Sequence, residues 1–352
     1  MPPSALYILV LLVLCGFSLF SRKHDVIACT CIAVLLAISA GFRPYGFDYA
    51  EYLLIIDNIF QEQVDDIDSL VTVAKDPFFS SVVLFTGLFS DDPHNVFLVI
   101  AVLSVGTKFF LALSLLRYSS LFLGVYSILL APGLEFAAIR AGLSLGFLGL
   151  LFIGGVSFGR RSVITALAVL SHISALVPIS MLWLTKPRRL DVFLILLLVT
   201  AAGMYLAIVL FDIVYTLDVV TGVNRSADYL YDKGTTNNFF FPVTTILILA
   251  MAAGWIFGRQ AVWDISKFPS ALFMAALLCA TAFGAALPIS TYVIRILEFA
   301  WFLYLYAMVV LFAQDRSGFF RSGFVIWLAL AGYANVYRET WEMMAPALFM
   351  DW

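Results

Sequence analysis

Long apolar runs separated by short polar segments make up most of the chain. Many of these runs approach the roughly twenty residues that a helix needs to cross a hydrocarbon core of about 30 Å. Strands that span a membrane would show short alternating segments instead. We therefore predict an all-α polytopic membrane protein with about ten full transmembrane helices, at residues 4–21, 25–42, 95–116, 118–134, 137–158, 190–211, 241–258, 268–289, 293–313 and 320–337.

The segment 162–184 departs from this pattern, because Ser171, His172 and Pro178 interrupt its centre and basic residues flank both of its ends. A single crossing would divide the 20 Lys and Arg residues equally between the two sides. A fold-back with His172 near the apex places 13 of the 20 inside and 7 outside, which agrees with the positive-inside rule. We predict this re-entrant broken helix, with His172 facing a cavity. A single spanning helix with a buried histidine is the alternative.

Under this layout residues 1–352 form a single transmembrane domain, and two large loops lie on the outer side. The loop 43–93 contains an amphipathic stretch, an acidic run and a short apolar patch at 78–89, which together predict amphipathic helices at the membrane surface. The loop 212–240 is polar and rich in tyrosine. Tyrosine and charge together suit the recognition of sugars, although tyrosine also gathers at membrane interfaces.

Composition supports the same class and excludes an ordinary soluble domain. Hydrophobic residues make up 63% of the chain and charged residues 12%, and the mean hydropathy is +1.02. Two short patterns resemble metal ligands. Cys29 and Cys31 have no second cysteine pair or histidine in their run, and Asp66 and Asp68 lie in a solvated acidic segment. We therefore predict packing and solvation for these residues, and no metal site.

Under this layout four arginines lie on the outer side or at the membrane edge, against the general trend of the basic residues: Arg43, Arg140, Arg225 and Arg295. Any one of them could simply pair with a carboxylate or a lipid phosphate, and Arg295 has Glu298 three residues further on the same helix face. Together they are harder to explain in this way. Because a guanidinium group binds phosphate with two parallel hydrogen bonds, the set predicts a site for an anionic diphosphate head group.

Three motifs and a late arginine resemble, in order and spacing, the EpsG-type and Wzy-type polysaccharide polymerases. Residues 43–52, Arg-Pro-Tyr-Gly-Phe-Asp-Tyr-Ala-Glu-Tyr, resemble the signature that follows the second span of that family. Residues 138–144, Ala-Ile-Arg-Ala-Gly-Leu-Ser, resemble its arginine-containing helix start, with Ala141 in place of the usual glutamine. Residues 170–176 resemble its Phe-His-x-Ser-Ala motif, with Ser171 in place of the aromatic residue. Arg295 opens a late span, as in the family.

This resemblance implies a GT-C-like fold that joins lipid-linked repeat units at the periplasmic face of the bacterial inner membrane. The donor would be a growing glycan on undecaprenyl diphosphate, and the acceptor a single lipid-linked repeat unit. Neither a cofactor nor a metal ion is implied. Besides this oligosaccharide and membrane lipid, a chain-length regulator is a candidate partner, and no nucleic acid is expected.

Two sets of site residues follow from the arginine pattern and the resemblance. The acceptor hydroxyl needs a base, and the candidates are Asp48, His172, Glu135 and Glu298. The first two rank highest because they lie within the motifs, although Asp48 could equally be a structural partner of an arginine. The candidates for binding the diphosphate and the sugars are Arg43, Tyr49, Tyr52, Arg140, Arg225 and Arg295.

Three other functions compete with the polymerase. A flippase for lipid-linked oligosaccharides would also bind diphosphate through arginines, but transporters often consist of two related halves, and this chain shows no internal repeat. A membrane acyltransferase could use His172, but its acyl donor would arrive by a route that the outer cluster of charges does not suggest. A purely structural subunit would not be expected to keep several ionisable groups at membrane depth.

Overall fold

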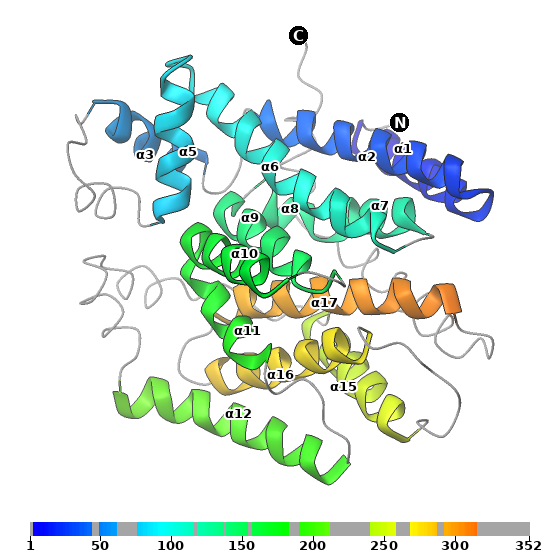
Figure 1. The fold of residues 1–352 in the computed structure, drawn as a ribbon. Coiled ribbons are helices and arrows are strands. Elements are labelled where there is room, and N and C mark those ends of the chain that lie inside the picture. Colours follow the sequence, from blue (N-terminus) through cyan, green and yellow to red (C-terminus); the bar gives the residue numbers. More distant parts are fainter. Residues whose placement is uncertain are drawn as a thin grey trace. The chain divides into compact units, whose positions relative to one another are not determined.

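The structure is a computed structural model that describes residues 3–43, 49–61, 76–115, 118–136, 138–153, 157–182, 190–211, 240–257, 268–286 and 292–314 (Figure 1). Within these residues all regular structure is helical, with 14 α-helices and two short 3-10 helices. The predicted all-α class is therefore confirmed for this part of the chain. Its helices form two compact units, the first running to Ala175 and the second beginning at Leu176.

The first unit is built around α6, which packs against both α2 and α9. Helix α9 in turn packs against α10, and α10 against α5. The helices and 3-10 helices of this unit are α1 (Pro3–Gly16), η1 (Phe17–Leu19), α2 (Arg22–Gly41), α3 (Tyr49–Gln61), α5 (Pro77–Gly87), α6 (Pro93–Leu113), α7 (Ser119–Leu129), α8 (Ala131–Leu134), α9 (Ile139–Leu150), α10 (Phe158–Ser171) and η2 (Ile173–Ala175).

Helix starts in the first unit follow capping signals in the sequence. The Ser21 side chain accepts a hydrogen bond from the backbone N–H of the third residue of α2. The Asp92 side chain accepts one from the backbone N–H of the second residue of α6, and a proline occupies the first helical position. Asp76 also precedes a proline, Pro77, which opens α5. The two side-chain caps supply partners for N–H groups that have no backbone acceptor in the first turn, and a proline there has no N–H that needs one.

Close contact between α6 and α9 depends on Gly146. A methyl group added there would lie 1.9 Å from Thr107 Oγ1 and 3.2 Å from the carbonyl oxygen of Ser104. Thr107 cannot move aside without losing the 2.7 Å hydrogen bond that its hydroxyl donates to Ser104. We expect Gly146→Ala to lower the free energy of unfolding by about 1–3 kcal/mol, because it forces the two helices apart.

A thermal melt of the purified protein in detergent, followed by intrinsic fluorescence, measures this effect. Gly106→Ala on α6 is the matched control, because an added methyl group meets nothing within 4 Å there. The control should keep or raise the melting temperature, since alanine favours a helix over glycine by about 1 kcal/mol. Equal melting temperatures for both variants would contradict the close packing of α6 and α9 at Gly146.

The second unit is built around α16, which packs against α11, α12, α15 and α17. Residues 271–282 of α16 are buried throughout. An added methyl group on Gly284 would lie 2.1 Å from the carbonyl oxygen of Ala201, so α12 also approaches α16 at backbone distance. The helices of this unit are α11 (Leu176–Met181), α12 (Leu190–Phe211), α15 (Phe240–Phe257), α16 (Phe268–Ala286) and α17 (Tyr292–Gln314).

The length and composition of the helices are consistent with a membrane protein. Among the described residues, α2 and α6 are long and apolar enough to cross a bilayer, and eight further apolar helical segments have 10–17 residues. Most predicted spans coincide with helices, and the predicted span 190–211 has the bounds of α12. The predicted span 320–337 lies outside the described residues. The side of the membrane on which each loop lies stays a prediction.

Some predicted spans are shorter in the structure than in the sequence-based prediction, and the span 4–21 is one of them, because α1 ends at Gly16. Residues 118–134 form α7 and the single turn of α8, with a break at Leu130. Pro132 accounts for this break, because proline has no N–H to continue the helical hydrogen bonds. The predicted span 137–158 ends as a helix at Leu150. Helices α3 and α5 occupy the positions predicted for amphipathic helices, whereas their place at the membrane surface stays a prediction.

The segment 162–184 is interrupted at His172. Helix α10 ends at Ser171, and His172 has an extended backbone with φ −166° and ψ 124°. The short η2 follows, and α11 begins at Leu176. His172 therefore lies outside a regular helix, and the direction of its imidazole does not follow the helical spacing of α10. The fold-back of the two halves toward one side of the membrane stays a prediction.

Candidate functional site

Asp76 lies between two of the predicted site residues. The carboxylate oxygen Oδ2 is 3.0 Å from Arg140 Nη1 and 3.8 Å from His172 Nδ1, and the Asp76 side chain is 2% exposed. The three residues come from the start of α5, the first turn of α9 and the end of α10. A carboxylate so deeply buried is stable only beside positive charge or hydrogen-bond donors. We call Asp76, Arg140, His172 and Tyr52 the carboxylate cluster.

Tyr52 completes the carboxylate cluster from α3. Arg140 Nε donates a hydrogen bond of 3.3 Å to the Tyr52 hydroxyl. The guanidinium carbon also lies 5.2 Å from the centre of the Tyr52 ring and 6.0 Å from that of Phe79, which are cation–π distances. The Arg140 side chain keeps 15% of its surface exposed, so the guanidinium group is oriented by its partners and still accessible.

The convergence of these segments follows from local packing. The Ser144 hydroxyl on α9 donates a 2.8 Å hydrogen bond to the carbonyl oxygen of Ala168 on α10. This bond lies one turn beyond Arg140 and one turn before His172, so it brings both side chains to the same end of the helix pair. On the other side, the Phe78 and Phe147 rings of α5 and α9 meet edge to face at 5.6 Å. These two contacts place Asp76, at the start of α5, beside both Arg140 and His172.

The arrangement suits an anionic ligand and a proton transfer. Arg140 belongs to the first turn of α9, where the helix dipole favours negative charge. At 3.8 Å the His172 ring is too far from Asp76 for a full hydrogen bond, but it is near enough for the carboxylate to stabilise a positive imidazolium. An arginine that could bind a phosphate and a histidine that could accept a proton therefore lie beside the same carboxylate.

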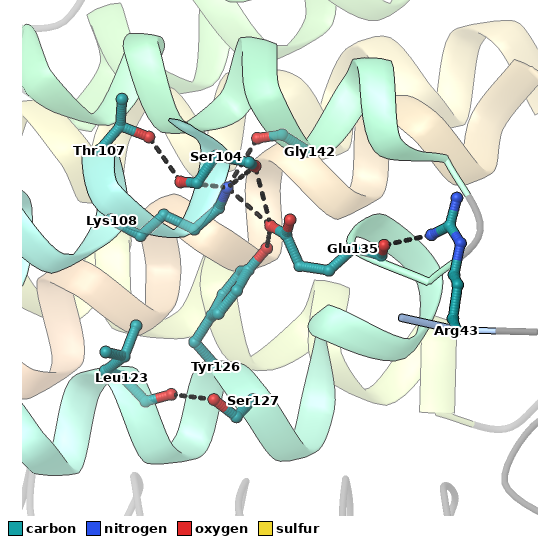
Figure 2. A network of polar contacts seen from close by, with 9 residues as sticks. All are labelled: Arg43, Ser104, Thr107, Lys108, Leu123, Tyr126, Ser127, Glu135 and Gly142. Atoms are coloured by element: carbon teal, nitrogen blue, oxygen red, sulfur yellow. Dashed lines mark hydrogen bonds and ion pairs between the residues drawn. The ribbon is translucent and has the colours of Figure 1, made fainter. Parts of the chain in front are cut away.

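A second polar group lies deeper in the first unit, around Glu135 (Figure 2). Glu135 Oε1 is 2.8 Å from Lys108 Nζ, and both side chains are almost fully buried. The same oxygen accepts hydrogen bonds from the Tyr126 hydroxyl at 2.6 Å and from the Ser104 hydroxyl at 3.1 Å. Figure 2 shows these donors gathered around one end of the carboxylate.

Arg43 reaches the same segment from the end of α2. Its side chain is fully buried, and Nη1 donates a hydrogen bond to the backbone carbonyl oxygen of Glu135 (Figure 2). The guanidinium carbon lies 4.9 Å from the centre of the Phe97 ring. The Tyr49 and Tyr52 rings also contact Phe97, so this aromatic ring separates Arg43 from the tyrosines of α3.

Tyr49 belongs to a third, more exposed polar group. Its hydroxyl is 3.3 Å from His94 Nε2, and His94 Nδ1 is 3.0 Å from Asp92 Oδ1. The backbone N–H of His94 also donates to Asp92, and this bond, with the one from the His94 ring, holds the pKa of the Asp92 carboxyl below its usual range. Burial raises the pKa of the Tyr49 hydroxyl. Tyr49 is therefore a neutral hydrogen-bonding group at neutral pH.

Comparison with known protein families decides what kind of protein carries these groups. The model of the EpsG family matches residues 26–346. The chain belongs to the EpsG family. This membership confirms the resemblance found in the sequence and links the protein to exopolysaccharide biosynthesis. No curated protein and no solved structure matches the chain.

In this EpsG-family chain, some of the predicted site residues meet and others cannot be placed. Arg140, His172 and Tyr52 meet in the carboxylate cluster, and Tyr49 and Arg43 border it through Phe97. Glu298 is a buried residue of α17 in the second unit. Asp48, Arg225 and the side chain of Arg295 lie outside the residues whose structure is described, so their roles stay predictions.

Sequence reasoning missed three residues that the structure brings into these groups. Asp76 bridges Arg140 and His172, but in the sequence it shows only the capping pattern of an aspartate before a proline. Lys108 is a single charge within an apolar run of α6, and such a charge is a signal for a buried partner. His94 carries no signal beyond its place at a helix start.

Proposed function

We propose that this EpsG-family protein is a polysaccharide polymerase. It would transfer a glycan from undecaprenyl diphosphate to a lipid-linked repeat unit at the periplasmic face of the bacterial inner membrane. The observation that carries the proposal is the carboxylate cluster, in which Arg140 and His172 lie beside the same oxygen of Asp76. A GT-C-like fold and a chain-length regulator as partner belong to the same proposal, on the family resemblance.

Arg140 serves the leaving group in this reaction. An acceptor hydroxyl attacks the anomeric carbon of the donor glycan, and the bond between that carbon and the diphosphate oxygen breaks. The lipid diphosphate departs with the electron pair, so negative charge develops on its oxygens. A guanidinium group already oriented by Asp76 and Tyr52 stabilises this charge without having to reorganise.

His172 serves the acceptor. Its imidazole takes the proton of the attacking hydroxyl, and the Asp76 carboxylate stabilises the imidazolium that forms. His172 keeps 18% of its side chain exposed, which leaves the ring accessible to a substrate. Asp48, which lies outside the described residues, is the second candidate for the base.

Purified protein in lipid nanodiscs, supplied with a synthetic undecaprenyl-diphosphate-linked repeat unit, tests the proposal. We expect a ladder of lengthened products without added nucleotide sugar and in the presence of EDTA, because the diphosphate supplies the leaving group. A flippase in proteoliposomes would instead move a labelled lipid across the bilayer without lengthening it. Translocation without products longer than one repeat unit would replace the polymerase with this second function.

A further inference from the structure

We propose that Lys108 and Glu135 form a clamp that holds the first turn of α9 in place and so positions Arg140 for the lipid diphosphate. The inference rests on the proposed function for its ligand, and on the geometry of the first unit for its mechanism. It makes Glu135 a positioning residue, although the sequence offered it as a candidate base. The clamp consists of Lys108, Glu135, Ser104 and Tyr126, with Arg43 as a further tie (Figure 2).

Lys108 joins α6 directly to the turn that carries Arg140. Besides the ion pair with Glu135, its Nζ donates hydrogen bonds to the Ser104 hydroxyl at 2.8 Å and to the backbone carbonyl oxygen of Gly142 at 2.7 Å. Gly142 follows Arg140 by two residues. A buried ammonium group with these partners has little freedom, so the carbonyl oxygen that it binds is fixed relative to α6.

Glu135 fixes the segment on the other side of Arg140. Its carboxylate is held from α6 by Lys108 and Ser104 and from α7 by Tyr126. Its backbone carbonyl oxygen is held by Arg43, at the end of α2. The chain is thus tied to three other helices within the few residues that lead into α9, which makes the entry to that helix rigid.

Gly142 shows how tightly the two ends of the clamp fit. A methyl group added there would lie 2.9 Å from the carbonyl oxygen of Leu134 and 3.3 Å from Glu135 Oε1. The first turn of α9 therefore rests directly on the end of α8. Arg140 projects from this contact toward Asp76, so a shift of the turn would move the guanidinium group away from the carboxylate cluster.

Two observations favour positioning over catalysis for Glu135. Its side chain is 1% exposed, and one of its oxygens already receives three donors, so an acceptor hydroxyl would have to displace them. A buried ion pair is also weak evidence for stability, because apolar residues of similar size often serve a fold as well. A hydrogen-bonded ion pair instead fixes the relative position of the segments that it joins, because its hydrogen bonds are satisfied in only one geometry.

The test is the double variant Lys108→Met/Glu135→Leu in the full-length protein. Removing both charges avoids the unpaired buried charge that each single variant would leave, so the fold should survive. Asp25→Asn is the matched control. Asp25 is another buried carboxylate of the first unit, which accepts backbone hydrogen bonds of 2.9 Å from Ser119 and Ser120 at the start of α7. It has no hydrogen bond to α9 among those described.

Three measurements in nanodiscs separate the outcomes: the melting temperature, hydrogen exchange of the amides at residues 138–145, and the dissociation constant for undecaprenyl diphosphate. We expect the double variant to melt no lower than Asp25→Asn. Its amides should exchange at least about tenfold faster, because the turn opens locally. The dissociation constant and the KM for the donor should rise about tenfold to a hundredfold, as expected for a misplaced binding group. Asp25→Asn should change neither the exchange rate of these amides nor the affinity for undecaprenyl diphosphate.

Unchanged amide exchange in the double variant would overturn the clamp, whatever the protein does with lipids. Unchanged affinity for undecaprenyl diphosphate, together with faster exchange, would overturn the link between the clamp and the ligand. The proposed function fails separately, and visibly so, if the wild-type protein binds undecaprenyl diphosphate but never lengthens a lipid-linked repeat unit. In that case exchange and affinity still decide the clamp.

Discussion

Arg140→Ala is expected to abolish polymer formation, with an initial rate at least about a thousandfold below that of the wild-type protein. The reason is that the departing diphosphate loses a guanidinium group that Asp76 and Tyr52 have already oriented. Arg140→Lys keeps the charge but cannot make two parallel hydrogen bonds, so it should recover only part of the activity. The rate at which longer glycans appear on a gel measures both effects.

The alanine variant needs a control for folding. It leaves the buried Asp76 carboxylate without its 3.0 Å partner, and breaking a buried pair in this way costs about 3–5 kcal/mol. The double variant Asp76→Asn/Arg140→Gln removes both charges and should insert and melt nearly as the wild type does, while remaining inactive. Full activity in Arg140→Lys would remove the argument for two parallel hydrogen bonds, and an active double variant would remove the site.

His172→Gln is expected to lower turnover by about a hundredfold or more if His172 is the base. Glutamine retains a polar side chain at the break between α10 and η2, but it cannot accept the proton of the acceptor hydroxyl. Asp76→Asn should also lower turnover, because it removes both the charge that stabilises the imidazolium and the partner that orients Arg140. Initial rates with a synthetic lipid-linked repeat unit, measured across a range of pH, report both effects.

The pH dependence separates a base from a structural residue. A neutral imidazole base makes the wild-type rate fall in acid, and this fall should disappear from the residual activity of His172→Gln. His24→Gln is the matched control, since His24 is an exposed histidine at the start of α2. It should keep the wild-type rate and profile. A wild-type rate in His172→Gln would instead make Asp48 the leading candidate for the base.

The sequence was informative where one residue type carries its own signal. An arginine at the start of an apolar helix and a histidine at a helix-breaking sequence are both costly in a membrane unless they have partners, and Arg140 and His172 are found together. Tyr52 could be predicted as a binding residue because it belongs to the family motif at residues 43–52. In the same way, runs of apolar residues located α2, α6 and α12 to within a few residues.

Partners that meet only through tertiary packing could not be found in this way. Asp76 is 64 residues from Arg140 in the sequence, and nothing in the periodicity of α5 indicates which helix its capping residue faces. The same holds for Lys108 and Glu135, which meet across α6 and the segment before α9. The break at Leu130 was missed for a different reason. Hydropathy is continuous there, whereas proline acts on the backbone.

One oxygen of Asp76 faces both Arg140 and His172, and this sharing has a consequence for the order of events. A diphosphate that binds the oriented guanidinium group offsets part of its positive charge, so the Asp76 carboxylate then stabilises a positive imidazolium more strongly. Arrival of the donor and readiness to accept a proton are thus coupled, and such coupling is reciprocal. We expect an ordered reaction in which the donor binds first. An acceptor that binds before the donor would meet a His172 imidazole that accepts a proton less readily.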